Sequence, residues 1–471
     1  MKIFLKKLAG FSIGPVAGAI ISLITIPLTT YFISPEEFGK SSMFTIMLSF
    51  INIILYLGMD QSFAREYHEV KNKNNLFFNS IIPPVIFSVI ICTLLILFRS
   101  TVSIALFKSE EYSHISIVLG CMLITAVLER FILMRIRMEE KAIEYSVFSI
   151  FVKCTVLFSL VFFIIFFEKN FLIVVYSTIF GQIIGDIYLI IRYRYFFKGC
   201  SVENIDSELM KKMLKFGFPL LIAASLNSFL NATGTFSIRK WSTFHELGIF
   251  SAGQRISNFL NIIQLAFTSF WIPTAYRWHK ENRELKNFKF ISDVLLLVMS
   301  IGFFIVIFFK NYIVILLSSD YAETKYIIGF LVMVPILYTL SETTTLGIVF
   351  SKKSYLNILV SIFSVFPCYI LNYYLVPLYG SRGASISIGI AYFLFFITRT
   401  ILSKNNDFDL KITKHYLVII VLFIVATLNL FDLKYILLAN LIFFILVILI
   451  QASVLIDLKK SIRGEQRFDL S

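Results

Sequence analysis

Long apolar runs alternate with short polar segments along almost the whole chain. The runs are roughly 17 to 25 residues long, and an α-helix of that length crosses a hydrocarbon core about 30 Å thick. The pattern therefore predicts an all-α integral membrane protein with about fourteen transmembrane helices. The predicted spans lie near residues 8–32, 42–64, 77–98, 114–134, 146–167, 171–191, 217–237, 249–273, 290–309, 326–350, 355–376, 384–402, 416–431 and 435–456.

The composition agrees with a chain that lies mostly in a bilayer. Hydrophobic residues make up 58% and charged residues 15% of the 471 residues, whereas soluble proteins have about 45 to 50% and about 25%. The five cysteines are odd in number and widely spaced, which predicts neither a disulfide framework nor a metal site. The predicted loops are too short to hold a soluble catalytic or nucleotide-binding domain of about 50 residues or more.

Positive charge predicts the orientation of the spans, because lysine and arginine collect in short cytoplasmic loops. Of the 43 lysines and arginines, 31 are counted with the cytoplasmic segments, including Arg130 and Arg399 near the inner ends of their spans. Ten, including Lys310, are counted with the outer segments, and Lys153 and Arg255 remain deeper inside spans. We therefore expect a multi-pass membrane protein with both termini cytoplasmic and an uncleaved first span. The net charge of +14 indicates attraction to anionic lipid headgroups and not to nucleic acid.

The segment FISPEEFGKSS, residues 32–42, ends like a nucleotide-binding loop. Such a loop needs a glycine five positions before its Gly-Lys-Ser, where this chain has Ser34, and Glu36 and Glu37 would repel phosphate. The same residues fit a helix start, with Ser34 as N-cap, Pro35 at the first position and Glu37 returning to the backbone of the cap. We therefore predict a helix here and no ATP binding.

A second copy of this pattern indicates an internal duplication. TFHELG has Thr243 as cap, Glu246 three residues later and Gly248. Before the two copies stand KKLAGFSIGP and KKMLKFGFP, and after them FAREYHE and AYRWHKE. The predicted organisation is therefore an N-lobe of spans 1–6, a basic cytoplasmic linker, a C-lobe of spans 7–12 and a segment with two additional spans and a tail; two such repeats are typical of transporters in which one lobe moves against the other. The boundaries are 1–191, 192–216, 217–402 and 403–471.

Polar residues inside the spans are the candidate substrate-binding residues. Gln254, Asn258 and Asn261 would share a wet helix face flanked by Arg255. A guanidinium in lipid costs at least about 2.5 to 3.5 kcal/mol, so Arg255 is expected to face a cavity, a carboxylate or a ligand phosphate, with snorkelling to the outer surface as the alternative. Further candidates, each with a structural alternative in snorkelling, helix packing or an ion pair, are Lys153, Asn227, Asn231, Asp60 and Arg65.

Acidic residues inside the spans are candidates for coupling transport to H⁺ or Na⁺. Asp60 could pair with Arg65, and Asp186 with Arg192, which would make them structural. Glu342 has no basic residue within two helical turns on its N-terminal side. Glu342 is therefore the preferred ion-coupling candidate, followed by Asp186.

Three stretches resemble the multidrug/oligosaccharidyl-lipid/polysaccharide (MOP) exporter superfamily, and within it the Wzx-type polysaccharide flippases. They are GPVAGAIISLITIPLTTYFISPEEFGKSS, LGMDQSFAREYHE and ELGIFSAGQRISNFLNIIQLAFTSFWIPTAYR. The resemblance covers roughly residues 8–402. It implies a V-shaped pair of helical lobes that moves undecaprenyl-diphosphate-linked oligosaccharide from the inner to the outer leaflet for O-antigen, capsule or exopolysaccharide biosynthesis.

The resulting functional prediction is a flippase that is not an enzyme and uses no ATP and no cofactor beyond a coupling ion. The expected partners are the lipid-linked oligosaccharide, membrane lipids, and a polysaccharide polymerase and glycosyltransferases. A cation-coupled multidrug exporter of the same superfamily is the alternative. It is disfavoured because the deepest charges, Arg255 and Lys153, are positive. A membrane polysaccharide polymerase is the third possibility.

Overall fold

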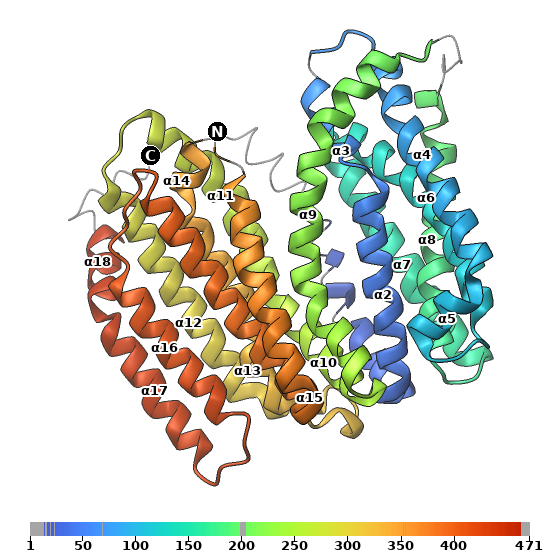
Figure 1. Ribbon diagram of the computed structural model, residues 1–471. Helices are drawn as coiled ribbons and strands as arrows, with labels where there is room; N and C mark the ends of the chain where they lie inside the picture. The colour runs from blue at the N-terminus through green and yellow to red at the C-terminus, as the bar shows by residue number, and fades with distance from the viewer. Residues whose placement is uncertain are drawn as a thin grey trace. The chain divides into compact units, whose positions relative to one another are not determined.

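A computed structural model describes residues 14–462, except 15, 16, 19, 23, 68, 198–203, 352 and 354. All regular secondary structure in these residues is helical (Figure 1). The lysines of the extreme N-terminus, part of the predicted linker and the tail after residue 462 lie outside the described residues. The α-helices are α2 (Pro35–Leu55), α3 (Met59–Glu66), α4 (Lys73–Leu97), α5 (Arg99–Phe107), α6 (Ser113–Met138), α7 (Ala142–Phe166), α8 (Leu172–Arg192), α9 (Ser207–Trp241), α10 (Phe244–Ser257), α11 (Asn261–Lys280), α12 (Leu285–Ile315), α13 (Thr324–Thr344), α14 (Leu346–Phe350), α15 (Leu356–Lys404), α16 (Thr413–Leu428), α17 (Ile436–Ile450) and α18 (Ala452–Ile462).

The prediction of an all-helical membrane protein is confirmed. Among the described residues, nine helices are long and apolar enough to cross a membrane, and α17 with α18 forms a tenth span bent by 51°. The remaining predicted spans correspond to the apolar helix Ile20–Phe32, the broken pair α10 and α11, the shorter α16, and the second half of α15, because α15 counts once among the nine but covers two predicted spans. The two halves of α15 meet at Gly380, whose φ of 52° and ψ of −125° interrupt the helix.

The chain divides into two compact units, and the boundary between Phe229 and Leu230 lies inside α9. In the first unit, α6 is the central helix and packs against α3, α4, α5, α7 and α8. In the second unit, α13 has the same position among α10, α11, α12, α15 and α16. Because α6 and α13 hold the fourth and tenth predicted spans, the packing repeats along the chain as a duplication requires; the domain limits predicted from sequence stay a prediction.

Both predicted helix starts are confirmed. The Ser34 hydroxyl accepts a hydrogen bond from the Glu37 N–H at 3.4 Å, and the Thr243 hydroxyl accepts one from the Glu246 N–H at 3.2 Å. The expectation that Glu37 returns to its own cap is wrong. Its Oε2 accepts a hydrogen bond from the Phe171 N–H at 2.9 Å, and Glu246 Oε2 accepts one from the Ser381 N–H at 2.7 Å.

These two contacts are equivalent in the repeat. Phe171 directly precedes α8, and Ser381 follows the kink at Gly380 and opens the second half of α15. The first N–H groups of a helix lack partners within the helix and carry a partial positive charge, so a carboxylate stabilises them. In each unit the glutamate of the second span thus caps the sixth span.

The second span of each unit is broken before its end. In the first unit, Leu57 and Gly58 have positive φ values of 53° and 70° between α2 and α3. In the second unit, the continuous helix expected over 249–273 is wrong, because α10 ends at Ser257 and a 3₁₀ turn, Asn258–Leu260, precedes α11. Such turns inside a span mark places where a helix can change direction.

The beginning of α9 closes one end of the first unit. The backbone of Gly217 approaches Gly58 so closely that a Cβ on Gly58 would lie 2.1 Å from the Gly217 oxygen. The Ser62 hydroxyl donates to the Met213 carbonyl at 2.7 Å, and Lys212 forms an ion pair with the buried Glu66 at 2.7 Å. These contacts explain why the unit boundary falls within α9 and not before it.

Gly380→Ala tests the cap at the kink of α15. A Cβ at this position would lie 2.6 Å from the Glu246 carboxylate, and its backbone conformation favours glycine, so we expect a loss of about 1 to 3 kcal/mol in the free energy of unfolding. The control is Gly302→Ala in α12, where the nearest atom lies 3.6 Å from the added Cβ. Thermal unfolding in detergent measures both, and equal melting temperatures would contradict the role of the kink.

Candidate functional site

Buried polar residues of the first unit gather around α6, and Asp60 of α3 is one of them. Asp60 is only 5% exposed. Its Oδ2 accepts hydrogen bonds from Arg130 Nη2 at 2.6 Å and Nε at 3.2 Å. The expected pair of Asp60 with Arg65 is therefore wrong: Arg65 lies over the Phe216 ring at 4.3 Å and its Nε is 3.9 Å from a Glu66 oxygen.

Two further carboxyl groups lie on the neighbouring face between α6 and α8. Gln182 Nε2 donates to Glu129 Oε2 and to Asp186 Oδ1, both at 2.8 Å. The Thr125 hydroxyl donates to the other Asp186 oxygen at 2.6 Å. The spacing of four residues places Thr125 with Glu129, and Gln182 with Asp186, on single helix faces.

This arrangement of two carboxyl groups determines which ions the site can bind. Asp186 is fully buried, and two carboxylates that share one amide donor repel each other unless a proton or cation lies between them. The described residues hold no group of three or more His, Cys, Asp or Glu side chains that could bind a metal ion. The cluster can take up a proton or a small monovalent cation. The expected pair of Asp186 with Arg192 is replaced by these hydrogen bonds.

The second unit has an ion pair in the equivalent place. Arg399 of α15 donates from Nη1 to Glu342 Oε1 at 2.8 Å and to the Ser341 hydroxyl at 3.0 Å. The Trp271 indole of α11 donates to the Glu342 carbonyl at 3.2 Å. Glu342 thus has a basic partner. The sequence of its own helix did not predict one, because no basic residue lies within two turns on its N-terminal side. Its role in ion coupling stays a prediction.

A largely buried aromatic cluster continues from this ion pair. The Arg399 guanidinium lies 4.5 Å from the centre of the Phe395 ring, which stacks on Tyr338 with ring centres 5.8 Å apart. Farther along α15, the Tyr392 hydroxyl donates to Asn231 Oδ1 of α9 at 2.6 Å. Asn231, a predicted substrate ligand, is itself exposed beside this cluster.

The other predicted substrate ligands lie in both units. Asn261 Nδ2 donates to Asn258 Oδ1 at 3.0 Å across the break between α10 and α11. Gln254 and Arg255 are half-buried near the end of α10. In the first unit, Asn227 is half-buried on α9, and Lys153 is exposed on α7 with its Cγ 3.7 Å from the position of a Cβ on Gly18. Their roles in binding stay predictions.

The sequence analysis missed three cations within the helices. Arg130 and Arg399, counted above with the cytoplasmic segments, lie inside α6 and α15. Lys310, assigned to an outer loop, is 7% exposed in α12 and donates to Asn429 Oδ1 at 2.7 Å. The adjacent pair Glu129–Arg130 inside the predicted span 114–134 was a signal that could have revealed the first of them.

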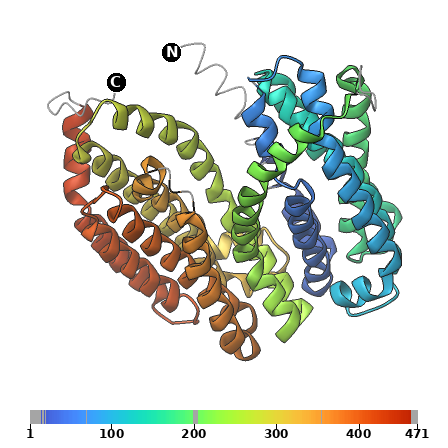
Figure 2. The ribbon, with the colours of Figure 1, turned by 45° about the horizontal axis from the view of Figure 1, so that its top comes forward.

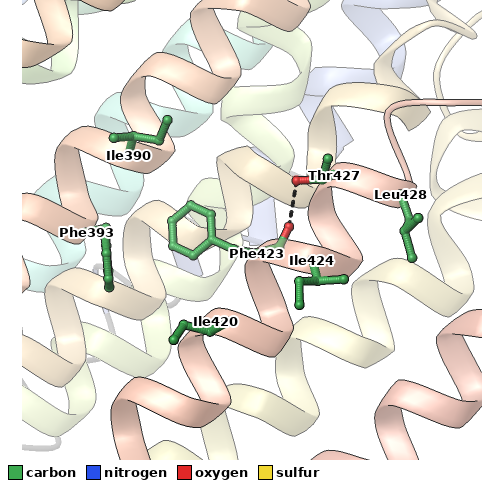
Figure 3. A pocket seen from close by; sticks show the side chains of 7 residues that line it. All are labelled: Ile390, Phe393, Ile420, Phe423, Ile424, Thr427 and Leu428. Atoms are coloured by element: carbon green, nitrogen blue, oxygen red, sulfur yellow. Dashed lines mark hydrogen bonds between the residues drawn. The ribbon is translucent and has the colours of Figure 1, made fainter.

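An apolar groove lies between the second half of α15 and α16, with a volume of 450 Å³ (Figure 3). Thr427, the one polar residue in its wall, turns its hydroxyl to the Phe423 carbonyl at 2.9 Å and presents no free donor. Such a surface suits hydrocarbon chains and not a diphosphate or a glycan. The lining residues are Ile390, Phe393, Ile420, Phe423, Ile424, Thr427 and Leu428.

Comparison with known proteins gives a family and a fold. The profile of the polysaccharide biosynthesis protein family matches residues 4–279, more than half of the chain. No curated protein sequence matches the chain significantly.

Solved structures of similar fold belong to transporters and a flippase. A lipid II flippase, MurJ, in an inward closed conformation has a TM-score of 0.67 at 17% identity, over 94% of this chain and 98% of that one. A multidrug resistance MATE transporter in an inward-facing conformation gives 0.61 at 15% identity, over 82% and 97%. A MOP superfamily transporter from Pyrococcus furiosus, described by a binding pocket of reverse polarity, gives 0.53 at 15% identity, over 85% and 95%. The fold of this chain is therefore that of the MOP superfamily.

Arg130→Gln tests the ion pair with Asp60. The variant leaves a buried carboxylate without its cation, so we expect a loss of about 1.5 to 3 kcal/mol, the range of a charge-assisted hydrogen bond. The loss stays in this range because the Arg130 side chain is 40% exposed. Asp60→Asn combined with Arg130→Gln is expected to recover part of that loss in a double-mutant cycle of thermal unfolding. Arg65→Gln is the matched control, and additive effects of the two substitutions would contradict the pair.

Proposed function

Because the chain belongs to the polysaccharide biosynthesis protein family, we propose that it moves undecaprenyl-diphosphate-linked oligosaccharide repeat units from the cytoplasmic to the outer leaflet. The observation that carries this proposal is the family match on a duplicated bundle of membrane helices, a fold that a solved lipid II flippase shares. A lipid-linked precursor has a polar head that cannot cross hydrocarbon unaided. Alternating access of two lobes solves that problem. The product serves O-antigen, capsule or exopolysaccharide assembly.

In this proposal, polar and basic residues guide the charged head while the polyprenyl tail stays in lipid. Arg255 binds the diphosphate, since a guanidinium forms paired hydrogen bonds with phosphate oxygens. Lys153 and Arg65 offer further positive charge along the path. Gln254, Asn258, Asn261, Asn227 and Asn231 offer hydrogen bonds to sugar hydroxyls. Asp60 acts by orienting Arg130.

Transport is driven by an ion gradient and not by ATP. We propose Asp186, together with Glu129, as the site that exchanges H⁺ or Na⁺, because Gln182 holds both carboxyl groups at 2.8 Å. Glu342 is a second candidate, which would release its ion by breaking the pair with Arg399. The protein is not an enzyme in this scheme. It works in the bacterial inner membrane with both termini cytoplasmic, beside a polymerase and glycosyltransferases.

The alternative is a cation-coupled multidrug exporter. The carboxyl cluster of Glu129 and Asp186 favours it, since an acidic interior suits cationic drugs, and multidrug transporters share the fold. The two functions differ in the expected effect of removing Arg255. A diphosphate carrier needs that guanidinium, whereas an exporter of cations gains from its loss.

Mass spectrometry of lipid-linked glycans in cells tests the substrate. Deleting the gene is expected to cause complete repeat units to accumulate on undecaprenyl diphosphate while surface polymer disappears. Arg255→Ala is expected to reproduce this at normal protein abundance. Lys286→Ala, which removes an exposed cation in the first turn of α12, is the control. Unchanged glycan lipids in the deletion strain, together with increased sensitivity to cationic dyes, would contradict the flippase proposal and favour the multidrug exporter.

Glu129→Gln and Asp186→Asn test ion coupling. In proteoliposomes, an imposed H⁺ or Na⁺ gradient is expected to accelerate transport by the wild type and to have about tenfold less effect on either variant, within the usual range of coupling free energies. Glu168→Gln, an exposed residue between α7 and α8, is the control. If both variants respond to the gradient as the wild type does, the coupling ion binds elsewhere.

A further inference from the structure

The last two spans are attached to the core of the second unit by polar contacts along α12. Figures 1 and 2 show the red helices α16 to α18 beside α12. In lipid, apolar surfaces give helices little preference for one another, so polar contacts and close packing hold them together. The three contacts with α12 are His415 with Ser292, Gln451 with Ser300, and Asn429 with Lys310. Asn429 also donates to Asn440 of α17 at 2.8 Å.

The donor and the acceptor in the hydrogen bond between His415 and Ser292 can be assigned. His415 is fully buried, and its Nε2 lies 2.9 Å from the Ser292 hydroxyl and 3.3 Å from the Ser292 carbonyl. A carbonyl oxygen can only accept, so Nε2 carries a hydrogen. Nε2 is therefore a donor whatever the charge of the ring.

A second chain of hydrogen bonds gives the same result. The Thr343 hydroxyl of α13 donates its one hydrogen to the Leu340 carbonyl at 2.8 Å. It must therefore accept from the Ser292 hydroxyl, 2.7 Å away. Ser292 has then used its own hydrogen and accepts from His415 Nε2, as the carbonyl argument requires.

The other ring nitrogen faces a carboxylate. His415 Nδ1 lies 3.7 Å from Asp293 Oδ1, and both atoms are buried without a hydrogen-bond partner among the described residues. With a neutral ring, Nδ1 is an acceptor directed at another acceptor. One added proton turns this pair into a charge-assisted hydrogen bond between imidazolium and carboxylate, for which the two side chains must approach by about 0.8 to 1 Å from their separation of 3.7 Å.

The charges around the pair come from three helices. Lys289 of α12 and Lys414 of α16 act on both groups, and Asp457 of α18 acts on Asp293. Lys414 also donates to the Ser453 hydroxyl of α18 at 2.5 Å. From α13, the Thr343 hydroxyl contacts Ser292 at 2.7 Å, and Glu342, the acidic residue of that helix, is paired with Arg399.

We propose that His415 and Asp293 form a one-proton latch between α16 and α12. A proton taken up at Nδ1 locks the terminal helices to the core, and its loss leaves two buried acceptors opposed and loosens α16. The latch is independent of the proposed substrate and belongs to the second unit, whereas the carboxyl cluster of Glu129 and Asp186 belongs to the first. It makes the attachment of the last two spans respond to the pH at that end of α16.

Hydrogen–deuterium exchange of the full-length protein in lipid nanodiscs tests the latch between about pH 4 and 8.5, a window that extends below ordinary histidine titration because the His415 ring is fully buried. After correction for intrinsic exchange, the first turns of wild-type α16 are expected to be about tenfold more protected at the acidic end, as one charge-assisted hydrogen bond allows. Asp293→Asn offers an amide N–H to neutral Nδ1, so the latch closes without a proton and protection is high at every pH. His415→Gln cannot titrate and shows no step.

Two control variants distinguish titration of the His415–Asp293 pair from titration of other acidic and histidine side chains. Asp457→Asn and His279→Gln are expected to retain the wild-type step. A wild type without a step, or a step that persists in Asp293→Asn, overturns the proposal. Because Asp293→Asn preserves side-chain size, the test stands even if His415→Gln fails to fold.

Discussion

The free-energy cost of leaving a polar group unpaired in hydrocarbon determines how the helices of this protein are arranged. Each such group loses water and regains stability only from another group of the protein. The helices solve this for the backbone, but their ends and their charged side chains need partners from other helices. The contacts that decide the structure are therefore few, polar and distant in sequence.

The two repeats meet this requirement in related but unequal ways. Both cap the sixth span with a glutamate of the second, and both place the most connected polar residues on the fourth, α6 or α13. They differ in charge. Glu342 and Arg399 neutralise each other, whereas Glu129 and Asp186 leave the first unit with acidic groups that one amide holds together. The two repeats therefore share their helix packing and capping but differ in the charges of their buried polar residues. This difference fits a transporter whose two halves have different tasks.

Local patterns in the sequence predicted what local physics determines. The spans follow from hydropathy, and the starts at Ser34 and Thr243 follow from the chemistry of helix caps. Partners across helices could not be found in this way, because a helix face shows which residues point together but not which helix lies opposite. Asp60 therefore appeared to belong to Arg65 on its own helix, while its actual partner, Arg130, is 70 residues away. The break after Ser257 was missed for a related reason, since no proline or glycine marks it.

The closure of the first unit by α9 has a consequence for biogenesis. Gly58, Ser62 and Glu66 find their partners in Gly217, Met213 and Lys212, all of which are synthesised after the sixth span. During synthesis, the first lobe therefore stays open at this end until the ribosome has begun the second repeat. The first half of the protein therefore cannot complete its packing before the second half begins to be synthesised. The first residues of α9 supply the last contacts of the first unit, so the order of translation also determines the order of assembly.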